Sequence, residues 1–268
     1  IILRSLKKMS NLNSYNRIVI KIGSAVLANP NGKVNQTVLA AISEDIAWLL
    51  KKGKDVLVVS SGAIALGRKN INLPENLSLP ESQAMAAHGQ IELMSAWKKH
   101  LNKYSIVIGQ ILLTPRDTEL KISSKNAKQT IEKLLEVGCL PIINENDTTA
   151  TDEIKFGDND LLAAKVAKLV KADLLIILSS VNGLYDSEEA VKTQKSEALV
   201  KEVTKISSKI KKMAGQASNM GKGGMISKIE AAEICFKNKS DMVIASGIRN
   251  KPIRSLNGKG KATWFVKR

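Results

Sequence analysis

The sequence predicts an α/β fold in which helices cover both faces of a mainly parallel sheet, a three-layer α/β/α sandwich. Short, almost wholly apolar runs alternate along the chain with longer segments in which apolar residues recur at helical spacing. Continuous apolar runs are typical of parallel strands that are buried on both faces. Several of these runs end directly at serine or glycine, and open α/β sheets bind their ligands at the carboxyl ends of such strands.

The first half of the chain contains four expected strands and the helices between them. Arg17–Ile22 is β-branched and apolar apart from Lys21, whereas Val34–Lys52 shows helical spacing and stops at Gly53. By the same criteria we expect strands at Asp55–Ser60, Ser105–Leu113 and Leu140–Ile143, helices at Glu81–Lys103 and Ser123–Glu136, and a loop at Leu73–Pro80.

The second half continues the alternation. A helix is expected over Leu161–Val170, with Asn159 or Asp158 as its N-cap. Asn182 and Gly183 form a turn signal after an apolar strand. The other expected elements are strands at Asp173–Ser179, Asp241–Ala245 and Thr263–Val266, the last at the sheet edge, helices at Val203–Ala214 and Ile229–Lys237, and a mobile polar insertion at about 186–201.

Length and composition favour one intracellular domain. A chain of 268 residues can bury a full core, so we expect a single domain over residues 16–268 after a disordered extension at residues 1–15, in which Met9 is a candidate start. Cys139 and Cys235 lie in apolar segments and outside any CxxC pair, as is typical of a reducing compartment. No run reaches the roughly 18 apolar residues of a membrane-spanning helix. We therefore expect a cytoplasmic protein without a membrane partner.

The charge balance raises nucleic acid as a partner and the distribution argues against it. The chain has 41 Lys and Arg against 25 Asp and Glu, a formal charge of +16. However, the basic residues are scattered along polar helix faces, and only three Phe, three Tyr and three Trp are available to stack on bases. We expect a solvated, lysine-rich surface and no specific nucleic-acid partner.

Two acidic clusters, Asn144–Asp147 (NEND) and Gly157–Asp160 (GDND), lie between an expected strand and the helix that follows it. A loop at this position lies over the ligand crevice of an open α/β sheet. Capping the helix and complementing its dipole would explain one or two of these acids, but not both clusters. We therefore expect the following side chains to converge on a ligand: Glu145, Asp147, Asp158, Asn159 and Asp160.

Three further segments have the chemistry of an anion site. Lys21 ends a buried strand beside Gly23, where a phosphate could approach the backbone closely. Ser61 and Gly62 lie at a strand-to-helix turn, and exposed N–H groups at a helix start bind anions. The glycine-rich loop Asn219–Lys228 also leads into a helix, with its final lysine adding a full charge. A snorkelling lysine, a close helix–sheet contact and a flexible linker are the structural alternatives.

Other motifs are missing from the sequence. No GxxxxGK[ST] loop occurs and no GxGxxG follows a strand, so a nucleotide site would need a different construction. His88 and His100 stand twelve residues apart in one helix without a partner carboxylate at ligand spacing. We assign no residue as a metal ligand.

The segments IKIGSAVL, VSSGAIALG, NEND with GDND, and GKGGM-x-x-K follow one another between Arg17 and Arg268, and in this order they resemble the amino-acid kinase family, specifically its glutamate 5-kinase branch. The resemblance implies a sheet of about eight strands in that family's α/β/α sandwich. It also implies that glutamate binds in the N-terminal half and ATP, with Mg²⁺, in the C-terminal half. The implied reaction is phosphorylation of the γ-carboxylate of L-glutamate to L-glutamyl 5-phosphate, the first step of proline biosynthesis.

The resemblance assigns roles residue by residue. Lys21 and Lys228 would act in catalysis on the transferring phosphoryl group, with Asp160 holding both lysines in place. The implied substrate-binding residues are Ser61, Gly62, Asp147 and Asn159. The implied ATP-binding residues are Lys21, Gly23, Ser179, Ser180, Lys222, Gly223, Gly224, Met225 and Lys228. Two positions depart from the family pattern, because Ser179-Ser180 replaces a Thr-Asp pair and Lys222 replaces a threonine.

The resemblance also suggests partners and regulation. It implies feedback inhibition by proline, a homo-oligomer (dimer or tetramer) and functional coupling to glutamyl phosphate reductase. Many members carry a further RNA-binding-like C-terminal domain, for which this sequence has no residues, so we expect a short form. Two alternatives stay open: a sister kinase acting on acetylglutamate, aspartate, carbamate or UMP, and a polyanion-binding protein with an inactive kinase fold.

Overall fold

The computed structural model describes residues 11–29, 31–69, 71, 74, 76–149, 159–193, 195–216, 224–258 and 260–267. These residues form one eight-stranded sheet. Its strands are β1 (Arg17–Ile22), β2 (Asp55–Ser60), β3 (Ile108–Leu113), β4 (Leu140–Glu145), β5 (Leu174–Ser179), β6 (Glu202–Val203), β7 (Asp241–Ser246) and β8 (Ala262–Phe265). Their order is β3-β4-β2-β1-β5-β7-β8-β6, and every pairing is parallel except that of β7 with β8.

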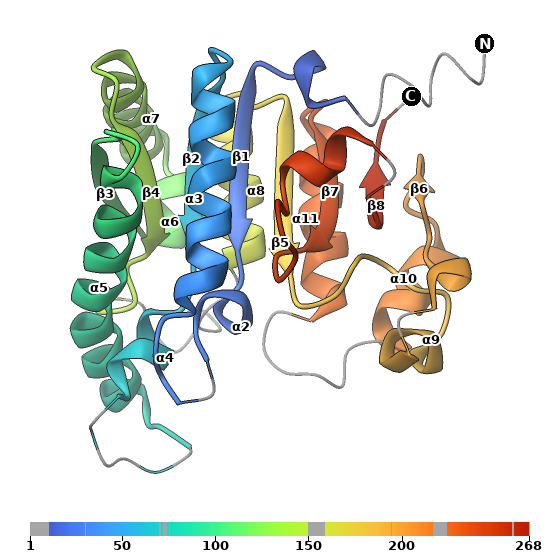
Figure 1. Cartoon of the computed structure of the whole chain (residues 1–268), viewed down its shortest axis with the longest axis horizontal. Helices are drawn as coiled ribbons and strands as arrows, with labels where there is room; N and C mark the ends of the chain where they lie inside the picture. Colours follow the sequence, from blue (N-terminus) through green and yellow to red (C-terminus); the bar gives the residue numbers. More distant parts are fainter. Residues whose placement is uncertain are drawn as a thin grey trace.

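Helices cover both faces of this sheet, which confirms the predicted fold class (Figure 1). One face packs against α3 (Gln36–Lys51), α5 (Leu79–Asn102) and the 3₁₀ turn η3 (Arg254–Asn257). The other packs against α7 (Lys121–Glu136), α8 (Asn159–Leu169) and α11 (Met225–Lys237). The shorter helical elements are η1 (Leu12–Ser14), α2 (Ser24–Leu27), α4 (Ala63–Gly67), α6 (Pro115–Glu119), α9 (Glu188–Thr193), η2 (Ser196–Ala198) and α10 (Ser208–Gln216).

Strand β1 shows why the central strands are apolar throughout. Ile18, Ile20 and Ile22 pack into the core on the α3 and α5 face. Val19 packs into the core on the α8 face, because successive side chains of a strand point to opposite sides. Both faces are covered, so the strand is apolar from Ile18 to Ile22 apart from Lys21, and its charged residues Arg17 and Lys21 lie toward its two ends.

Two glycines let α4 and α5 pack with their backbones almost touching. A Cβ atom on Gly67 would lie 1.9 Å from the carbonyl oxygen of Met85, and one on Gly89 would lie 1.8 Å from that of Ala63. No larger residue fits either position without moving a helix. The contact fixes α5 against the start of α4, where the chain leaves β2.

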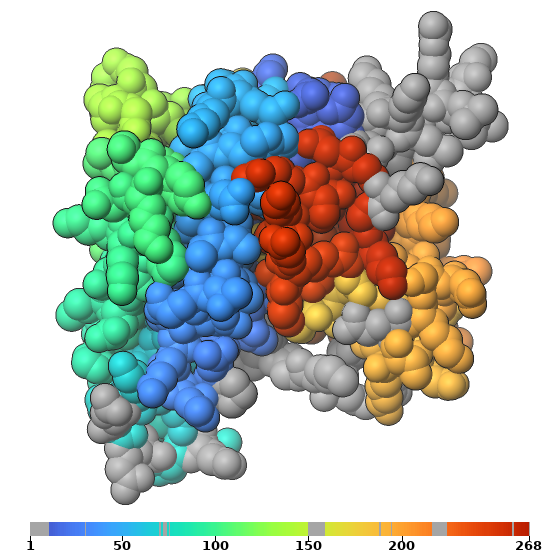
Figure 2. Space-filling view, in the orientation of Figure 1, coloured from blue at the N-terminus to red at the C-terminus, as the bar shows by residue number. Residues whose placement is uncertain are grey.

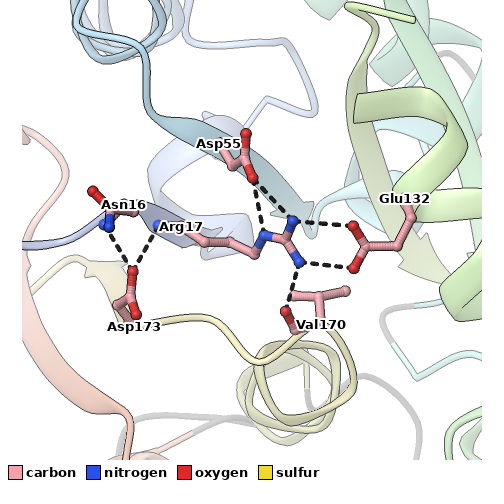
Figure 3. A network of polar contacts seen from close by, with 6 residues as sticks. All are labelled: Asn16, Arg17, Asp55, Glu132, Val170 and Asp173. Carbon is pink, nitrogen blue, oxygen red and sulfur yellow. Dashed lines mark hydrogen bonds and ion pairs between the residues drawn. The ribbon is translucent and has the colours of Figure 1, made fainter. Parts of the chain in front are cut away.

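The amino end of β1 is held by a polar network around Arg17 (Figure 3). Its guanidinium donates from Nη2 to Asp55 Oδ2 on β2 at 2.9 Å and from Nη1 to Glu132 Oε1 on α7 at 2.7 Å. Nη1 also donates to the carbonyl oxygen of Val170, after α8, at 2.8 Å. Asp173 accepts the backbone N–H of Arg17 at 2.9 Å. The network therefore joins two strands and two helices at the amino edge of the sheet.

The C-terminal segment packs against α3 through a buried carboxylate. Asp45, fully buried on α3, accepts the backbone N–H groups of Ile253 at 2.8 Å and Arg254 at 3.0 Å. Burial raises the pKa of Asp45 even though these hydrogen bonds favour its ionised form. In Figure 2 this segment, in red, lies directly against the blue N-terminal part of the molecule.

The predicted disordered extension at residues 1–15 is wrong for its last five residues, while residues 1–10 lie outside the described part of the chain. Leu12 in η1 is 1% exposed and Tyr15 is 7% exposed. The Tyr15 hydroxyl donates to Asp241 Oδ2 at 2.8 Å, and its ring stacks on Trp264. Burial and the neighbouring Asp241 raise the pKa of Tyr15. Two isolated apolar residues among asparagines carry too weak a sequence signal for a docked turn.

Helix α5 begins two residues earlier than predicted and shortens the expected loop. Ser78 caps it, and Glu81 completes a capping box by accepting the backbone N–H of Ser78 at 2.7 Å. Pro80 is tolerated because the first helical turn needs no N–H donors. The short helix α6, which opens with a capping box between Thr114 and Asp117, was not predicted.

The region after β5 differs most from the sequence prediction. Its polar segment is not an unstructured insertion: it contains α9 and η2, and Tyr185, Ala190 and Leu199 form a small buried cluster. The helix expected at Val203–Ala214 begins only at Ser208, because Glu202 and Val203 pair with β8 instead. That pairing makes β6 the edge strand. The strand predicted at Thr263–Val266 is present as β8, but the prediction that it lies at the edge of the sheet is wrong.

Candidate functional site

A cleft of about 780 Å³ opens at the carboxyl ends of the central strands. Its walls come from the residues that follow β1, β2, β4 and β5 and from the first turns of α8 and α11. The structure brings the following sequence-predicted residues into its lining: Lys21, Gly23, Ser61, Gly62, Asp147, Asn159, Ser179, Ser180 and Lys228. Residues from five separate segments therefore meet in one space.

Two buried lysines contact one buried aspartate at this cleft. Lys21 Nζ lies 2.6 Å from Asp160 Oδ1, and Lys228 Nζ lies 2.9 Å from Asp160 Oδ2. Their exposed fractions are 7% for Lys21, 5% for Lys228 and 0% for Asp160. The three residues come from β1, α11 and α8, so the contact joins both halves of the sheet. We call these three residues the lysine cluster.

Electrostatics favours the ionised form of Asp160. Burial opposes ionisation of Asp160, but the charges and hydrogen bonds of Lys21 and Lys228 outweigh it and lower the pKa of Asp160. Ser227 also donates its hydroxyl to Asp160 Oδ2 at 3.3 Å. A buried carboxylate held from several sides fixes both ammonium groups at the cleft wall.

Asp147 is a second buried carboxylate of a different kind. It is 8% exposed and lines the cleft. Burial, and then the neighbouring charge of Glu145, raises the pKa of Asp147 to about 7. Across the described residues no side chain or backbone group donates a hydrogen bond or ion pair to Asp147. Such a carboxylate gains most from a cationic ligand, because burial has removed water from it.

Asn159 opens α8 and binds the residues on both sides of it. Its Nδ2 donates to Ser61 Oγ at 2.8 Å and to Asn144 Oδ1 at 2.9 Å. Within the described chain its buried Oδ1 has no hydrogen-bond partner. Because α8 begins at Asn159, this residue is part of the helix and is not its N-cap. The alternative N-cap, Asp158, lies outside the described residues.

Sequence reasoning missed Asn144 as a site residue. It is 3% exposed, is the last residue but one of β4, lines the cleft and accepts a hydrogen bond from Asn159. Its place at the start of the NEND cluster was the available signal.

Glycine positions differ in what they offer an anion. Gly62 has φ of +110°, a left-handed conformation that glycine adopts readily, and it starts α4 at the cleft. Gly23 starts α2, and its own N–H donates to the carbonyl oxygen of Leu178 at 3.1 Å. The amide of Gly23 is therefore occupied. The N–H groups of Val26 and Leu27 donate to the carbonyl oxygen of Gly23, so within α2 only those of Ser24 and Ala25 are left for a ligand at the cleft.

The glycine-rich loop is described only from its end. Lys222 and Gly223 lie outside the described residues. Gly224 is the N-cap of α11, and Met225 packs its side chain into the core on the α8 face. Neither Gly224 nor Met225 is among the residues that line the cleft. Gly224 has no side chain and that of Met225 is buried, so these two residues could contact a ligand only through their backbone atoms.

A second, smaller cavity of about 380 Å³ adjoins the cleft, against α5 and β3. Its lining combines apolar side chains, among them Ile91, Met94 and Leu112, with polar and charged ones from α5, β3 and the end of β4. Asp147 lines both cavities. The wall between them therefore belongs to the loop that follows β4.

Two other kinds of feature are absent from the described ranges. No group of three or more His, Cys, Asp or Glu side chains that could hold a metal ion occurs among those residues. Likewise, none of the helices seen there is both long and apolar enough to cross a membrane.

Comparisons with known proteins identify relatives of this chain. The model of the amino acid kinase family matches residues 16–246. Glutamate 5-kinase of Bradyrhizobium diazoefficiens is 48% identical over 258 residues, which cover 95% of this chain and 69% of that protein. Glutamate 5-kinase of Pelagibacter ubique is 47% identical over 251 residues, which cover 93% of this chain and 68% of that protein. The chain thus spans about two thirds of these relatives' length.

A solved structure supports the fold alone. The UMP kinase from Ureaplasma parvum superposes with a TM-score of 0.63 over 94% of this chain and 99% of that one. The two sequences are 20% identical, so the likeness carries no information about the substrate.

Proposed function

The chain belongs to the amino acid kinase family, and from this premise we propose that it transfers the γ-phosphoryl group of ATP to the γ-carboxylate of L-glutamate. The product is L-glutamyl 5-phosphate, and the reaction is the first step of proline biosynthesis. The observation that carries the proposal is that one cleft holds both the lysine cluster and the carboxylate of Asp147, which has no hydrogen-bond or ion-pair partner among the described residues. The lysine cluster can bind a phosphoryl group, and the carboxylate of Asp147 can bind the ammonium group of an amino acid.

The lysine cluster acts on the phosphoryl group in this proposal. Phosphoryl transfer develops charge on the oxygens of the moving group and needs positioning and neutralisation more than covalent chemistry. Lys21 and Lys228 donate hydrogen bonds to those oxygens, and Asp160 keeps both ammonium groups in place through the transfer. Because the lysines are already buried and fixed, little reorganisation is needed during the reaction.

No general base is required. The attacking γ-carboxylate of glutamate has an ordinary pKa of about 4.3 and is ionised at neutral pH. Backbone N–H groups at the starts of α2 and α4, beside Gly23 and Gly62, are positioned at the cleft to bind neighbouring anionic groups.

Mg²⁺ would enter with the nucleotide. This ion usually keeps several waters and is bound through one or two carboxylates and substrate phosphates, so we propose that the nucleotide phosphates supply most of its ligands. When bound, it supplies charge neutralisation on the nucleotide phosphates. Ser179 and Ser180 are the residues of this half that line the cleft, and we propose that they, with the backbone from Lys222 to Met225, hold the nucleotide.

Glutamate itself is held at its amino-acid end. We assign the ammonium group to Asp147 and to the free Oδ1 of Asn159, with Ser61 and Gly62 completing the pocket. This assignment separates glutamate from its acetylated analogue. An acetylated nitrogen carries no charge and would leave the buried Asp147 without a counter-ion.

The remaining proposals concern the protein's setting. We propose a cytoplasmic homo-oligomer, a dimer or tetramer, with the exposed Ile91 and Leu112 near the β3 edge as part of a subunit contact. We propose feedback inhibition by proline, which shares the α-carboxylate and cationic nitrogen of glutamate and could compete for Asp147. The labile acyl phosphate also suggests functional coupling to glutamyl phosphate reductase.

A hydroxylamine trap tests the activity. The purified protein is given MgATP, hydroxylamine and, in parallel, glutamate, N-acetylglutamate, aspartate or UMP, with ADP release measured alongside. We expect glutamate to give a hydroxamate and the fastest ADP release. Equal or faster turnover with N-acetylglutamate or aspartate would overturn the substrate while leaving the fold intact.

A further inference from the structure

A chain of hydrogen-bonded amides runs from the cleft to helix α5. Asn159 Nδ2 donates to Asn144 Oδ1 at 2.9 Å, and Asn144 Nδ2 donates to Gln90 Oε1 at 2.8 Å. Gln90 lies on α5 and lines the second cavity. The chain therefore links a residue outside the cleft to the residue that we assign to the glutamate ammonium group.

Every amide in this chain points the same way. A side-chain amide has a donor end and an acceptor end, so each link fixes the orientation of the next. Because Asn144 presents Oδ1 to Asn159, the two hydrogens of Asn159 Nδ2 are used by Asn144 and by Ser61. Oδ1 is the end of Asn159 that is left over: it is buried and has no partner in the part of the chain that the structure describes.

The orientation matters because the two ends of an amide carry opposite partial charges. An Asn159 turned the other way would present an NH₂ group to a cationic ligand, with which it could form no hydrogen bond. Ser61 cannot prevent this, since a hydroxyl can donate as well as accept. The carbonyl oxygen of Ser60 also accepts from Asn159 Nδ2, but at 3.5 Å it is a longer contact than that of Asn144. Asn144 is buried and can hold the orientation only while its own Nδ2 has an acceptor.

Gln90 is that acceptor. Its Nε2 is buried and has no hydrogen-bond partner among the described residues, and Gln90 lines the second cavity together with Glu145 and Asp147. Negative charge on that side favours the NH₂ end of the amide there and leaves Oε1 facing Asn144. Gly89 has no side chain, which allows α5 to approach α4 closely. This close packing fixes the position of the neighbouring residue Gln90 relative to the sheet.

We propose that Gln90 is a positioning residue for the acceptor substrate: through Asn144 it fixes Asn159 with its carbonyl oxygen toward the ammonium group of glutamate. The inference rests on the proposed function. It assigns Gln90 no contact with either substrate, and it predicts a loss confined to ligands that carry a cationic nitrogen.

The test compares glutamate with glutarate, which has the same two carboxylates and no ammonium group. Gln90→Met keeps the length and helix preference of the side chain and removes the acceptor. We expect it to raise the Michaelis constant for glutamate about 3- to 10-fold, the usual worth of one hydrogen bond, with turnover nearly unchanged. The inhibition constant of glutarate should not change.

Two controls separate positioning from general damage. Gln90→Glu keeps an oxygen toward Asn144 and should bring the glutamate constant back toward the wild-type value. His88→Met, an exposed position two residues earlier on α5, should change nothing. Thermal unfolding of all three variants, compared with the wild type, reports whether α5 stays intact.

A double-mutant cycle decides whether Gln90 acts through Asn159. In an Asn159→Ala background, Gln90→Met should add less than twofold to the glutamate constant, because the group it positions is gone. An equal effect in both backgrounds, or an equal rise in the glutarate constant, would overturn the inference. Absence of glutamate turnover in the wild-type protein would instead overturn the proposed function, together with the inference that depends on it.

Discussion

Strand β1 carries a cation at each end, and the two ends are built differently. At the amino end, Arg17 meets the carboxylates of Asp55 and Glu132, and its side chain is 23% exposed. At the carboxyl end, Lys21 meets Asp160, and their side chains are 9% and 0% exposed. The first cation has two carboxylates, whereas in the second cluster two ammonium groups pair with one carboxylate among the described residues.

The difference separates a structural cluster from a reactive one. Around Arg17 the negative charges outnumber the positive charge and the group is saturated with hydrogen bonds, so a further anion has no place there. At Lys21 and Lys228 the charges are desolvated and lie on the wall of a cleft. Interactions between charges are strongest where water is excluded, so this is the end at which an incoming anion is stabilised.

The largest expected effect comes from removing a charge at the carboxyl end. Lys228→Met should reduce turnover about 10²- to 10³-fold or more, because a fixed charge near the transferring phosphoryl group is lost. The Michaelis constants for glutamate and ATP should change less. Steady-state ADP release at saturating substrates measures this, and near-normal turnover in a folded variant would make Lys228 a structural residue.

The two buried aspartates of the cleft should differ in which constant they change. Asp160→Asn should lower turnover by about 10²-fold with the Michaelis constant for glutamate changed less, because both lysines lose their anchor. Asp147→Asn should raise that constant about 10- to 100-fold with turnover changed less, the range for a lost hydrogen bond to a charged group. Indistinguishable variants would show that the two acids act as one network.

The pH dependence of glutamate binding should follow Asp147. Its pKa is about 7 in the free protein, so a growing share of Asp147 is protonated as the pH falls below 7. The ammonium group then loses its counter-ion, and kcat/KM for glutamate should fall about tenfold per pH unit. Rates measured from pH 5.5 to 8.5 test this, and a profile that is equally steep in Asp147→Asn would contradict the assignment.

The same shift has a consequence for stability. An unfolded chain ionises this aspartate near pH 4, whereas the folded chain keeps it protonated up to about pH 7. The folded state therefore binds more protons in that window, and stability falls as the pH rises through it. Asp147→Asn should unfold at a higher temperature than the wild type at pH 8, and at nearly the same temperature at pH 4.

Arg17 should show the smallest effect on activity. Arg17→Met should destabilise the fold by about 1–2 kcal/mol, a modest loss because Asp55 and Glu132 are partly exposed and solvent screens them. Thermal or urea unfolding measures the change. A loss of turnover at saturating substrates larger than about threefold would mean that the amino edge of the sheet influences the reaction.

Sequence patterns were sufficient for the strands and for most of the cleft. Continuous apolar runs predicted β1, β2, β4, β5 and β7, because strands that are covered on both faces need apolar side chains on both sides. Parallel strands end at one edge, so the loop residues that follow them were expected close together. The contact of Asp160 with both Lys21 and Lys228 was expected from the family resemblance. The structure of weakly apolar segments was predicted wrongly. Tyr185, Ala190 and Leu199 form a buried cluster, but in the sequence they are a few apolar residues among many charged ones.

Hydrogen-bond direction was out of reach of sequence reasoning. Nothing in the spacing of Gln90 and Asn144, which lie 54 positions apart, indicates that their amides meet. The same holds for Gly23, where a prediction of an exposed amide could not foresee that Leu178 accepts its N–H. These contacts depend on how α5 and β5 pack against their neighbours, which only the folded chain determines.

One comparison tests the central claim most directly: the yield of hydroxamate from glutamate, MgATP and hydroxylamine with Lys21→Met and with Arg17→Met, each assayed at a temperature where both are folded. The two residues lie four positions apart on one strand. The account predicts a loss of about 10²-fold or more for Lys21→Met and a yield within about threefold of wild type for Arg17→Met. Equal yields, or a larger loss at Arg17, would contradict it.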